Sequence, residues 1–133
     1  MDLIKIHLLA TAILTGAIWV IQLIHYPVFK YIDKSYFKLF MKFHVRGILI
    51  FVLPFMLIEI VSGTYLFIIG HNSILFLFSL VILYLIWIST LLIFSNYHKK
   101  LQHDKDNDII NKLVKYNWFR TLGWTVRLIL ICL

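Results

Sequence analysis

Several stretches of this chain are long, apolar and almost free of charge. Residues 6–29 and 60–98 contain no Asp, Glu, Lys or Arg, and residues 47–69 contain a single one, Glu59. About 20 consecutive apolar residues are enough for a helix to cross the hydrocarbon core of a bilayer. The sequence therefore predicts an all-α protein, a bundle of four transmembrane helices in one domain, residues 1–133. The spans are expected at about residues 3–29, 44–69, 74–96 and 117–133.

The composition agrees with a protein embedded in a lipid bilayer and argues against nucleic-acid binding. Hydrophobic residues make up 62% of the chain and charged residues 14%, whereas roughly 25% of residues are charged in soluble domains. The net charge is +7, but eleven of the 13 basic residues lie within residues 30–46 or 99–120, at the ends of the predicted spans. The positive-inside rule then places loops 30–43 and 97–116 in the cytoplasm and both termini outside a bacterial inner membrane.

The segments between the spans carry signals of their own. Lysines recur every four residues from Lys30 to Lys42 with aromatic residues between them, which predicts an amphipathic helix on the membrane surface between the first two spans. Pro27 comes just before this segment and predicts the end of the first span. Residues 70–73 form a short uncharged turn, so spans two and three are expected to be an antiparallel hairpin. Residues 108–116 are expected to be helical and continuous with the fourth span.

Polar side chains recur along one face of the first and of the last span. His7 and His25 are 18 residues apart, which is five turns at about 3.6 residues per turn, and Thr11 and Gln22 lie close to the same line. Because ionisable groups are costly in lipid, such a face is expected to point into the bundle. One face of the fourth span carries Asn117, Arg120, Thr121, Trp124 and Arg127.

Glu59 is the polar residue that packing explains least. It falls near mid-depth of the second span, where a lone carboxylate either takes up a proton or pairs with a cation. Arg127 is the partner expected from its depth in the fourth span. The pair is either structural, holding helices together, or functional, as an acid–base pair beside a ligand.

Most of the polar residues fall in one layer near the predicted cytoplasmic side, and a functional site is expected there. Such a site would combine acid–base groups with groups that contact a ligand. The candidate acid–base residues are His25, His44, Glu59 and Arg127. The candidate ligand-binding residues are Gln22, Tyr26, Arg46, Asn117, Arg120 and Thr121. The same layer also holds Asn96 and His98, whereas Glu59 and Arg127 are expected deeper in the bundle.

Three functions fit these residues. The first is the binding or conversion of a small lipophilic molecule with an anionic or phenolic head group. The second is a non-catalytic accessory or assembly subunit of a membrane complex, whose polar faces serve helix packing and contacts between copies in a homo-oligomer. The third is a redox protein in which His25 and His44 ligate haem. The single cysteine, Cys132, offers no disulfide and no cysteine-based metal site, and no metal centre is expected.

Five segments carry a resemblance to a known group of proteins. They are GAIWVIQLIHYPVF (residues 16–29), His44 with Arg46, residues 54–59, LIWISTLLI (residues 85–93) and NWFRTLGWTVR (residues 117–127). Together they resemble an uncharacterised family of small bacterial four-helix integral membrane proteins, over nearly the whole chain.

Two further resemblances rest on single motifs. The Asn-Trp-x-Arg-Thr pattern is similar to the anthrone-oxygenase-like small membrane proteins, which implies a cofactor-free oxygenase site at Asn117, Arg120 and Thr121. A histidine near the start of the first span, His7, and Trp19 after it form a pattern similar to that of the protoporphyrinogen-oxidase-like four-helix haem proteins. Residues 74–96 lack the lysine expected of that group in its third span.

Overall fold

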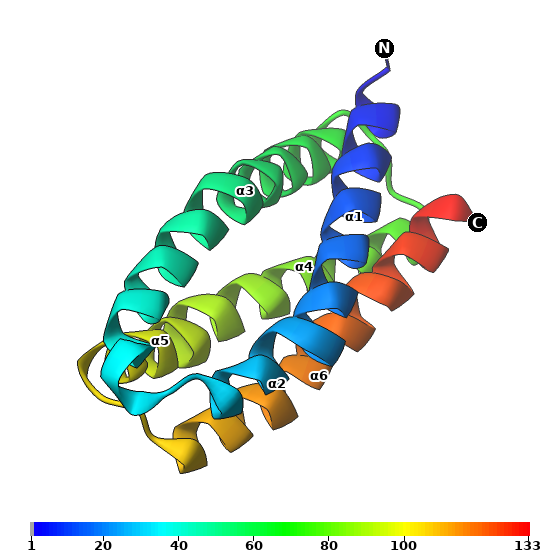
Figure 1. Ribbon diagram of the computed structural model, residues 1–133. Coiled ribbons are helices and arrows are strands. Elements are labelled where there is room, and N and C mark those ends of the chain that lie inside the picture. Colours follow the sequence, from blue (N-terminus) through cyan, green and yellow to red (C-terminus); the bar gives the residue numbers. More distant parts are fainter. Residues whose placement is uncertain (1) are drawn as a thin grey trace.

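Four long helical rods make up residues 2–133, the part of the chain that the computed structural model describes (Figure 1). The first rod comprises α1 (Leu3–Val20), the π-helical segment η1 (Ile21–His25), α2 (Tyr26–Val28) and the 3₁₀ turn η2 (Phe29–Tyr31). The second is α3 (Lys34–Ile68). The third comprises α4 (Ile74–Ser89), the π-helical segment η3 (Thr90–Phe94) and α5 (Ser95–His103), and the fourth is α6 (Asn107–Cys132). No strand is present within residues 2–133.

Three of the rods, Leu3–Tyr31, Lys34–Ile68 and Ile74–His103, are long and apolar enough to cross a membrane. Their outer surfaces carry large apolar side chains, of which Ile50 and Leu92 are 67% and 65% exposed. A continuous apolar exterior of this kind is typical of a protein that faces lipid. The rods and their surfaces therefore support the prediction of a helical membrane protein.

The predicted surface helix between the first two spans is not a separate element, because residues 34–43 are the first turns of α3. Asp33 caps this helix by accepting hydrogen bonds from the backbone and side chain of Ser35, at 2.8 and 2.6 Å. These bonds hold the pKa of Asp33 below its usual value. Phe37 and Met41 are buried in the core, so one apolar face of residues 34–43 packs on the protein, whereas Tyr36, Leu39 and Phe43 are exposed.

The α-helical part of the first rod ends at Val28, one residue after Pro27, and the 3₁₀ turn η2 continues to Tyr31, close to the predicted end at residue 29. A proline inside a helix removes one backbone hydrogen bond and crowds the carbonyl four residues earlier. The π-helical turn η1 lies directly before it, and such a turn holds one extra residue and alters the hydrogen-bond pattern. The first span therefore passes the proline with a local irregularity.

The third rod also continues beyond its predicted end at residue 96. A second π-helical segment, η3, precedes α5, and α5 reaches His103. Leu101 is fully buried in the core, so packing of one apolar side chain holds a segment that is too polar to cross lipid. Residues 108–116 are helical and continuous with the rest of α6, as the sequence predicted.

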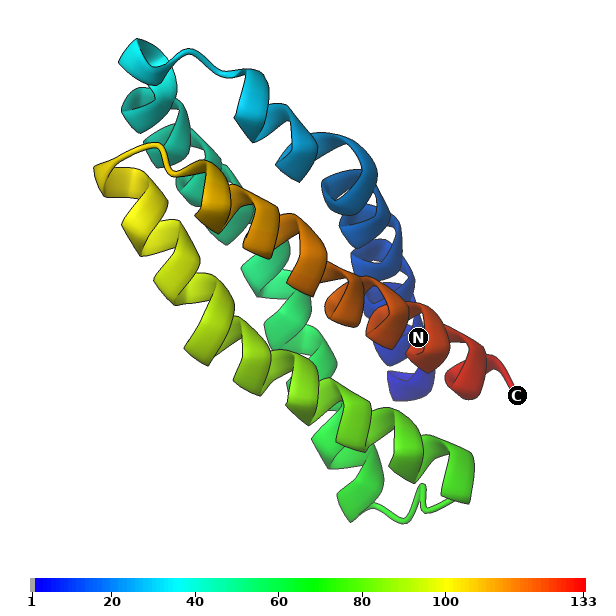
Figure 2. The same ribbon diagram turned by 90° about the horizontal axis from the view of Figure 1, so that it is seen from below.

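The rods run alternately up and down. The two termini and the loop between α3 and α4 lie at one end of the molecule, which we call the terminal end (Figures 1 and 2). Gly70, with φ of +99°, makes this loop tight, and the predicted hairpin is present. The connections before α3 and before α6 lie at the other end, the basic end. There the ammonium group of Lys105 donates to the carbonyls of Lys30 and Ile32 and joins the two connections.

The rods do not pack uniformly around one axis. α3 packs along α1, while α6 packs against both α1 and α4. α3 and α4 have much less contact with each other. The middle of α3, from Val45 to Phe55, contains no fully buried residue. This part of α3 borders a cavity.

Candidate functional site

The first of two polar networks lies towards the terminal end and is closed on itself. Glu59 and Arg127 form an ion pair, as the sequence predicted, and both side chains are fully buried. Thr11 and Trp124 donate to the two carboxylate oxygens of Glu59, at 2.8 and 3.1 Å. Arg127 also donates to the backbone carbonyl of Ser79 at 2.9 Å. We call this set, with His7 and Ser62, the closed network.

His7 completes the closed network on the side of α1. Its Nε2 atom lies 3.3 Å from the guanidinium of Arg127 and its Nδ1 atom 2.8 Å from the hydroxyl of Ser62. Because a guanidinium only donates, Nε2 of His7 accepts, and the neutral ring donates from Nδ1 to Ser62. Ser62 in turn donates to the carbonyl of Ile58. Every charge in the closed network therefore has a partner, and neither Glu59 nor Arg127 is among the residues that line the cavity described below.

The second network lies towards the basic end and joins residues from all four rods. His25 Nε2 lies 2.5 Å from His44 Nδ1, and His44 Nε2 lies 3.2 Å from His98 Nε2. The hydroxyl of Tyr26 lies 3.4 Å from the same nitrogen of His98 and accepts from Arg120 at 3.1 Å. We call this set, with the amides described next, the histidine–arginine network.

Two amide side chains orient Arg120. Asn117 accepts from Arg120 Nε at 2.9 Å and from one terminal nitrogen at 2.6 Å. Asn117 itself donates to Gln22 at 2.9 Å, and Gln22 donates to the carbonyl of Val114 at 3.2 Å. Thr121 also reaches Gln22, at 3.4 Å. Asn117, Arg120 and Thr121 thus lie on one face of α6, as predicted. Asn117, held by Gln22, keeps the guanidinium of Arg120 in one direction.

Arg120 has no carboxylate partner. Within residues 2–133 the ion pairs are Asp2–Lys5, Lys34–Asp104 and Glu59–Arg127. The guanidinium of Arg120 is instead stacked over the ring of Phe94, 3.7 Å from its centroid, and the residue is 7% exposed. Its charge is therefore held in an apolar setting with hydrogen bonds and an aromatic face but without an opposite charge.

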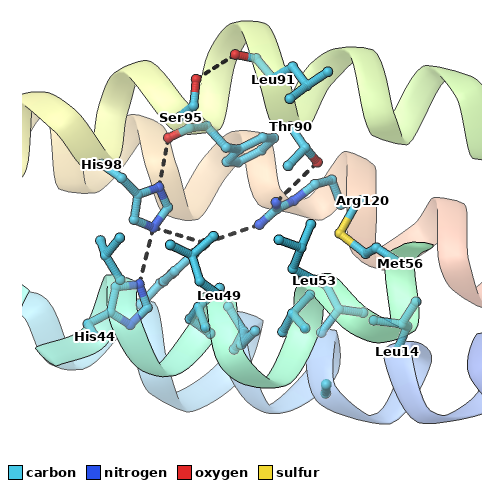
Figure 3. A pocket seen from close by; sticks show the side chains of 18 of the residues that line it. Leu14, His44, Leu49, Leu53, Met56, Thr90, Leu91, Ser95, His98 and Arg120 are labelled. Atoms are coloured by element: carbon cyan, nitrogen blue, oxygen red, sulfur yellow. Dashed lines mark hydrogen bonds between the residues drawn. The ribbon is translucent and has the colours of Figure 1, made fainter. Parts of the chain in front are cut away.

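A cavity of about 480 Å³ lies between α3 and the third rod, with α1 and α6 behind it. Figure 3 shows His44 and His98 together at one end, Arg120 pointing inward, and Leu14 and Met56 at the far end. The remaining wall is mostly aliphatic and aromatic. Leu49, Leu53 and Leu91 line the cavity and are also 52%, 37% and 60% exposed. The cavity therefore opens sideways, between the apolar outer faces of two rods.

The structure brings together most of the predicted site residues but not all. Tyr26, His44 and Arg120 line the cavity, and His25 lies one hydrogen bond from it. Gln22, Asn117 and Thr121 do not line the cavity and act on it through Arg120. Glu59 and Arg127 belong to the closed network and are separated from the cavity by Trp124, which lines the cavity and bonds Glu59.

Arg46, a predicted ligand-binding residue, does not line the cavity. It follows His44 by two residues, which is about 200° around a helix. The side chain is exposed and lies outside the cavity. Arg46 therefore lies on a different face of α3 from His44, although the two residues are close in sequence.

His98 lines the cavity, although the sequence predicts only that it shares the polar layer and that the third span ends before it, at residue 96. The π-helical segment η3 and the continuation into α5 carry His98 over the cavity, where its Nδ1 atom lies 2.7 Å from the carbonyl of Phe94. No local sequence signal indicates the apolar lining residues, such as Trp87 and Met56, because they come from different rods.

The histidine pair does not fit the predicted haem ligation. His25 and His44 face one another across 2.5 Å, and two ligand nitrogens on opposite sides of one metal atom, at about 2 Å each, lie much further apart. Within residues 2–133 no group of three or more His, Cys, Asp or Glu side chains is placed to hold a metal ion. The two ring nitrogens are arranged to share a proton.

Comparison with protein families, with curated proteins and with solved structures finds no match for this chain. The resemblances drawn from the sequence motifs remain predictions.

Proposed function

We propose that this chain is an inner-membrane protein of four spans that binds a small lipophilic molecule with an anionic head group in the cavity between α3 and the third rod. In this proposal α6 is the fourth span, although its charged residues make it less apolar than the others. The basic end faces the cytoplasm, in keeping with the positive-inside rule. The cavity then lies at the depth of the cytoplasmic leaflet of the bilayer.

The observation that carries this proposal is the unpaired charge of Arg120. A buried guanidinium without a counter-charge is costly in a low-dielectric setting. Arg120 is nevertheless fixed by Asn117 and Tyr26 and points into the cavity. An anionic head group would supply the missing charge and accept charge-assisted hydrogen bonds. The oriented arginine is thus explained by a ligand and not by packing within the chain.

The shape of the cavity supports a lipophilic body for the same ligand. Its volume lies within the range of about 300–1,000 Å³ that is usual for small-molecule sites. The apolar wall suits a hydrocarbon or aromatic body, and the sideways opening lies where acyl chains would surround the protein. A ligand could therefore enter from the bilayer without passing through water.

Within this proposal the protein is an enzyme if its cavity-lining histidines transfer a proton during a reaction of the ligand, and a binding protein if they do not. His44 and His98 line the cavity beside Arg120, where they are suited to give or take a proton at the head group.

The accessory-subunit function has support of a different kind, because the closed network holds four rods together without any ligand. It is the alternative that an empty cavity would favour.

The first experiment is an absorption spectrum of the protein purified in mild detergent, followed by organic extraction and mass spectrometry. A colourless protein that carries a fatty acid, a phenol or a related acidic lipid is expected. A haem band lost in His44→Ala would overturn the proposal. A colourless and empty protein would favour the accessory subunit.

Binding is then measured with radiolabelled palmitate and with hexadecanol, which differ in the charge of the head group. Wild type is expected to prefer palmitate, and Arg120→Gln to lose roughly 10- to 100-fold in palmitate affinity, because a hydrogen bond to a charged group contributes about 1.5–3 kcal/mol. Arg46→Gln removes an exposed arginine outside the cavity and is the matched control. Equal losses in both variants would contradict the site.

A second pair of variants tests the position of the ligand. Ala17 lines the cavity from α1, whereas Ala12 on the same helix is exposed. Ala17→Phe is expected to fill the cavity and abolish palmitate binding, and Ala12→Phe to leave it unchanged. Retained binding in Ala17→Phe would place the ligand elsewhere.

A further inference from the structure

Three histidines from three different rods lie in a row between the edge of the molecule and the cavity. His25 of η1 is half-buried and does not line the cavity, whereas His44 of α3 and His98 of α5 both line it. Consecutive ring nitrogens are 2.5 and 3.2 Å apart. The row reaches the cavity beside Tyr26, whose hydroxyl also contacts Arg120.

The carbonyl of Phe94 fixes the direction of these hydrogen bonds. A carbonyl oxygen only accepts, so the neutral ring of His98 carries its proton on Nδ1 and accepts at Nε2. His44 must then donate from Nε2 and accept at Nδ1, since two lone pairs would otherwise face each other. His25 must donate from Nε2 by the same argument. One backbone carbonyl therefore sets the tautomers of all three rings.

We propose that His25, His44 and His98 form a proton relay between water at the basic end and the head group of a ligand in the cavity. The inference rests on the proposed function, because it assigns the relay's task to the ligand of that site. If the row of histidines ended at a closed packing interface, a fixed direction of its hydrogen bonds would serve no proton transfer. This row ends at the cavity beside Arg120.

The transfer balances as a series of three hops. A proton binds Nδ1 of His25, the Nε2 proton of His25 moves to Nδ1 of His44, and the Nε2 proton of His44 moves to Nε2 of His98. His98 is then an imidazolium, and its Nε2 proton is hydrogen-bonded to the anionic head group. One proton has entered and is held between His98 and the head group. The resting tautomers are restored when a proton returns along the same path.

The groups around the row couple the relay to the ligand. The titratable and charged groups near it are Tyr26 from α2, Arg120 from α6 and Lys99 from α5, which lines the cavity. No carboxylate lies among the cavity-lining residues within the described chain. An imidazolium at His98 beside the Arg120 charge is unfavourable by Coulomb repulsion until an anion arrives. Binding of an anionic head group and uptake of a proton are therefore expected to occur together.

The tautomers are tested first, without any ligand. Solid-state NMR of protein labelled with ¹⁵N at histidine, in phosphatidylcholine bilayers, distinguishes protonated from unprotonated ring nitrogens. The relay requires a proton on Nδ1 of His98 and on Nε2 of His25 and His44 at neutral pH. A proton on Nδ1 of His44, or on Nε2 of neutral His98, would overturn it whether or not the cavity binds palmitate.

The rate of proton uptake is the second test. Stopped-flow mixing with palmitate follows binding by tryptophan fluorescence and proton uptake by a pH-indicator dye. Wild type is expected to take up protons as it binds, His25→Phe to take them up at least tenfold more slowly, and added imidazole to restore the rate. His103→Phe, at the exposed end of α5, is the control and should match wild type.

The outcomes separate the relay from the proposed function. Palmitate binding without proton uptake, or uptake at the wild-type rate in His25→Phe, would overturn the relay and leave the binding site intact. If His25→Phe does not fold, His25→Asn, which keeps a polar group at the edge, takes its place in the same assay. Absence of palmitate binding in wild type would overturn the proposed function, and the NMR result alone would then decide the relay.

Discussion

The closed network and the histidine–arginine network each contain a buried arginine from the same face of α6, and they differ in how its charge is met. Arg127 has Glu59 as an ion-pair partner, and the surrounding donors and acceptors are used. Arg120 has Asn117, Tyr26 and the ring of Phe94 but no acid. The seven-residue spacing alone would make the two residues look equivalent.

The difference shows which buried charge is structural. A fully paired charge that lines no cavity has nothing left to offer a ligand, so its effect is on packing. An oriented charge without a counter-ion, beside a cavity, has a free interaction to make. The distinction depends on the partner and on the neighbouring space, not on burial, because both arginines are buried.

The largest expected effect comes from separating the ion pair of the closed network. Glu59→Leu or Arg127→Met alone leaves a buried charge unpaired and is expected to cost about 3–5 kcal/mol of unfolding free energy. The double variant should lose clearly less than the sum of the single losses. Thermal unfolding in detergent measures all three. Small and additive losses would mean that the pair does not hold the rods together.

A smaller effect is expected at Gly63, which lies under the ring of His7. A Cβ at this position would come within 2.8 Å of His7 Cε1 and 2.9 Å of Leu80 Cδ2. His7 is held by Ser62 and Arg127 and cannot move freely, so Gly63→Ala should cost about 1–3 kcal/mol by overpacking.

Gly47 provides the control for that substitution on the same helix. No atom lies within 4 Å of a Cβ built at this position, so Gly47→Ala should stabilise α3 by about 0.5–1 kcal/mol. Thermal unfolding of the two variants is compared directly. Equal effects would show that the closed network is loosely packed.

The smallest change in stability is expected for Arg120→Met, about 1 kcal/mol or less in either direction. The substitution removes hydrogen bonds to Asn117 and Tyr26 but also removes an unpaired buried charge, and the two effects oppose each other. The same thermal assay gives the value. A loss as large as that of Arg127→Met would make Arg120 a packing residue and would remove the contrast between the two networks.

The sequence predicted the helical rods, the hairpin turn and the inward faces of the first and last spans. Hydrophobic length and helical periodicity depend on local sequence, and so these features could be read directly. The prediction of a separate surface helix failed because packing overrode a local signal. Residues 34–43 are the first turns of α3, with Phe37 and Met41 packed in the core.

By itself, then, the sequence determined that ionisable groups lie inside a helical membrane protein and that Glu59 and Arg127 can pair. Only the tertiary structure decided that Arg120 remains without an acid, that Arg46 points away, and that His98 completes a row with His25 and His44. The reason is physical. Hydropathy and periodicity fix the face of each helix, whereas partners and cavities depend on how side chains from separate rods meet.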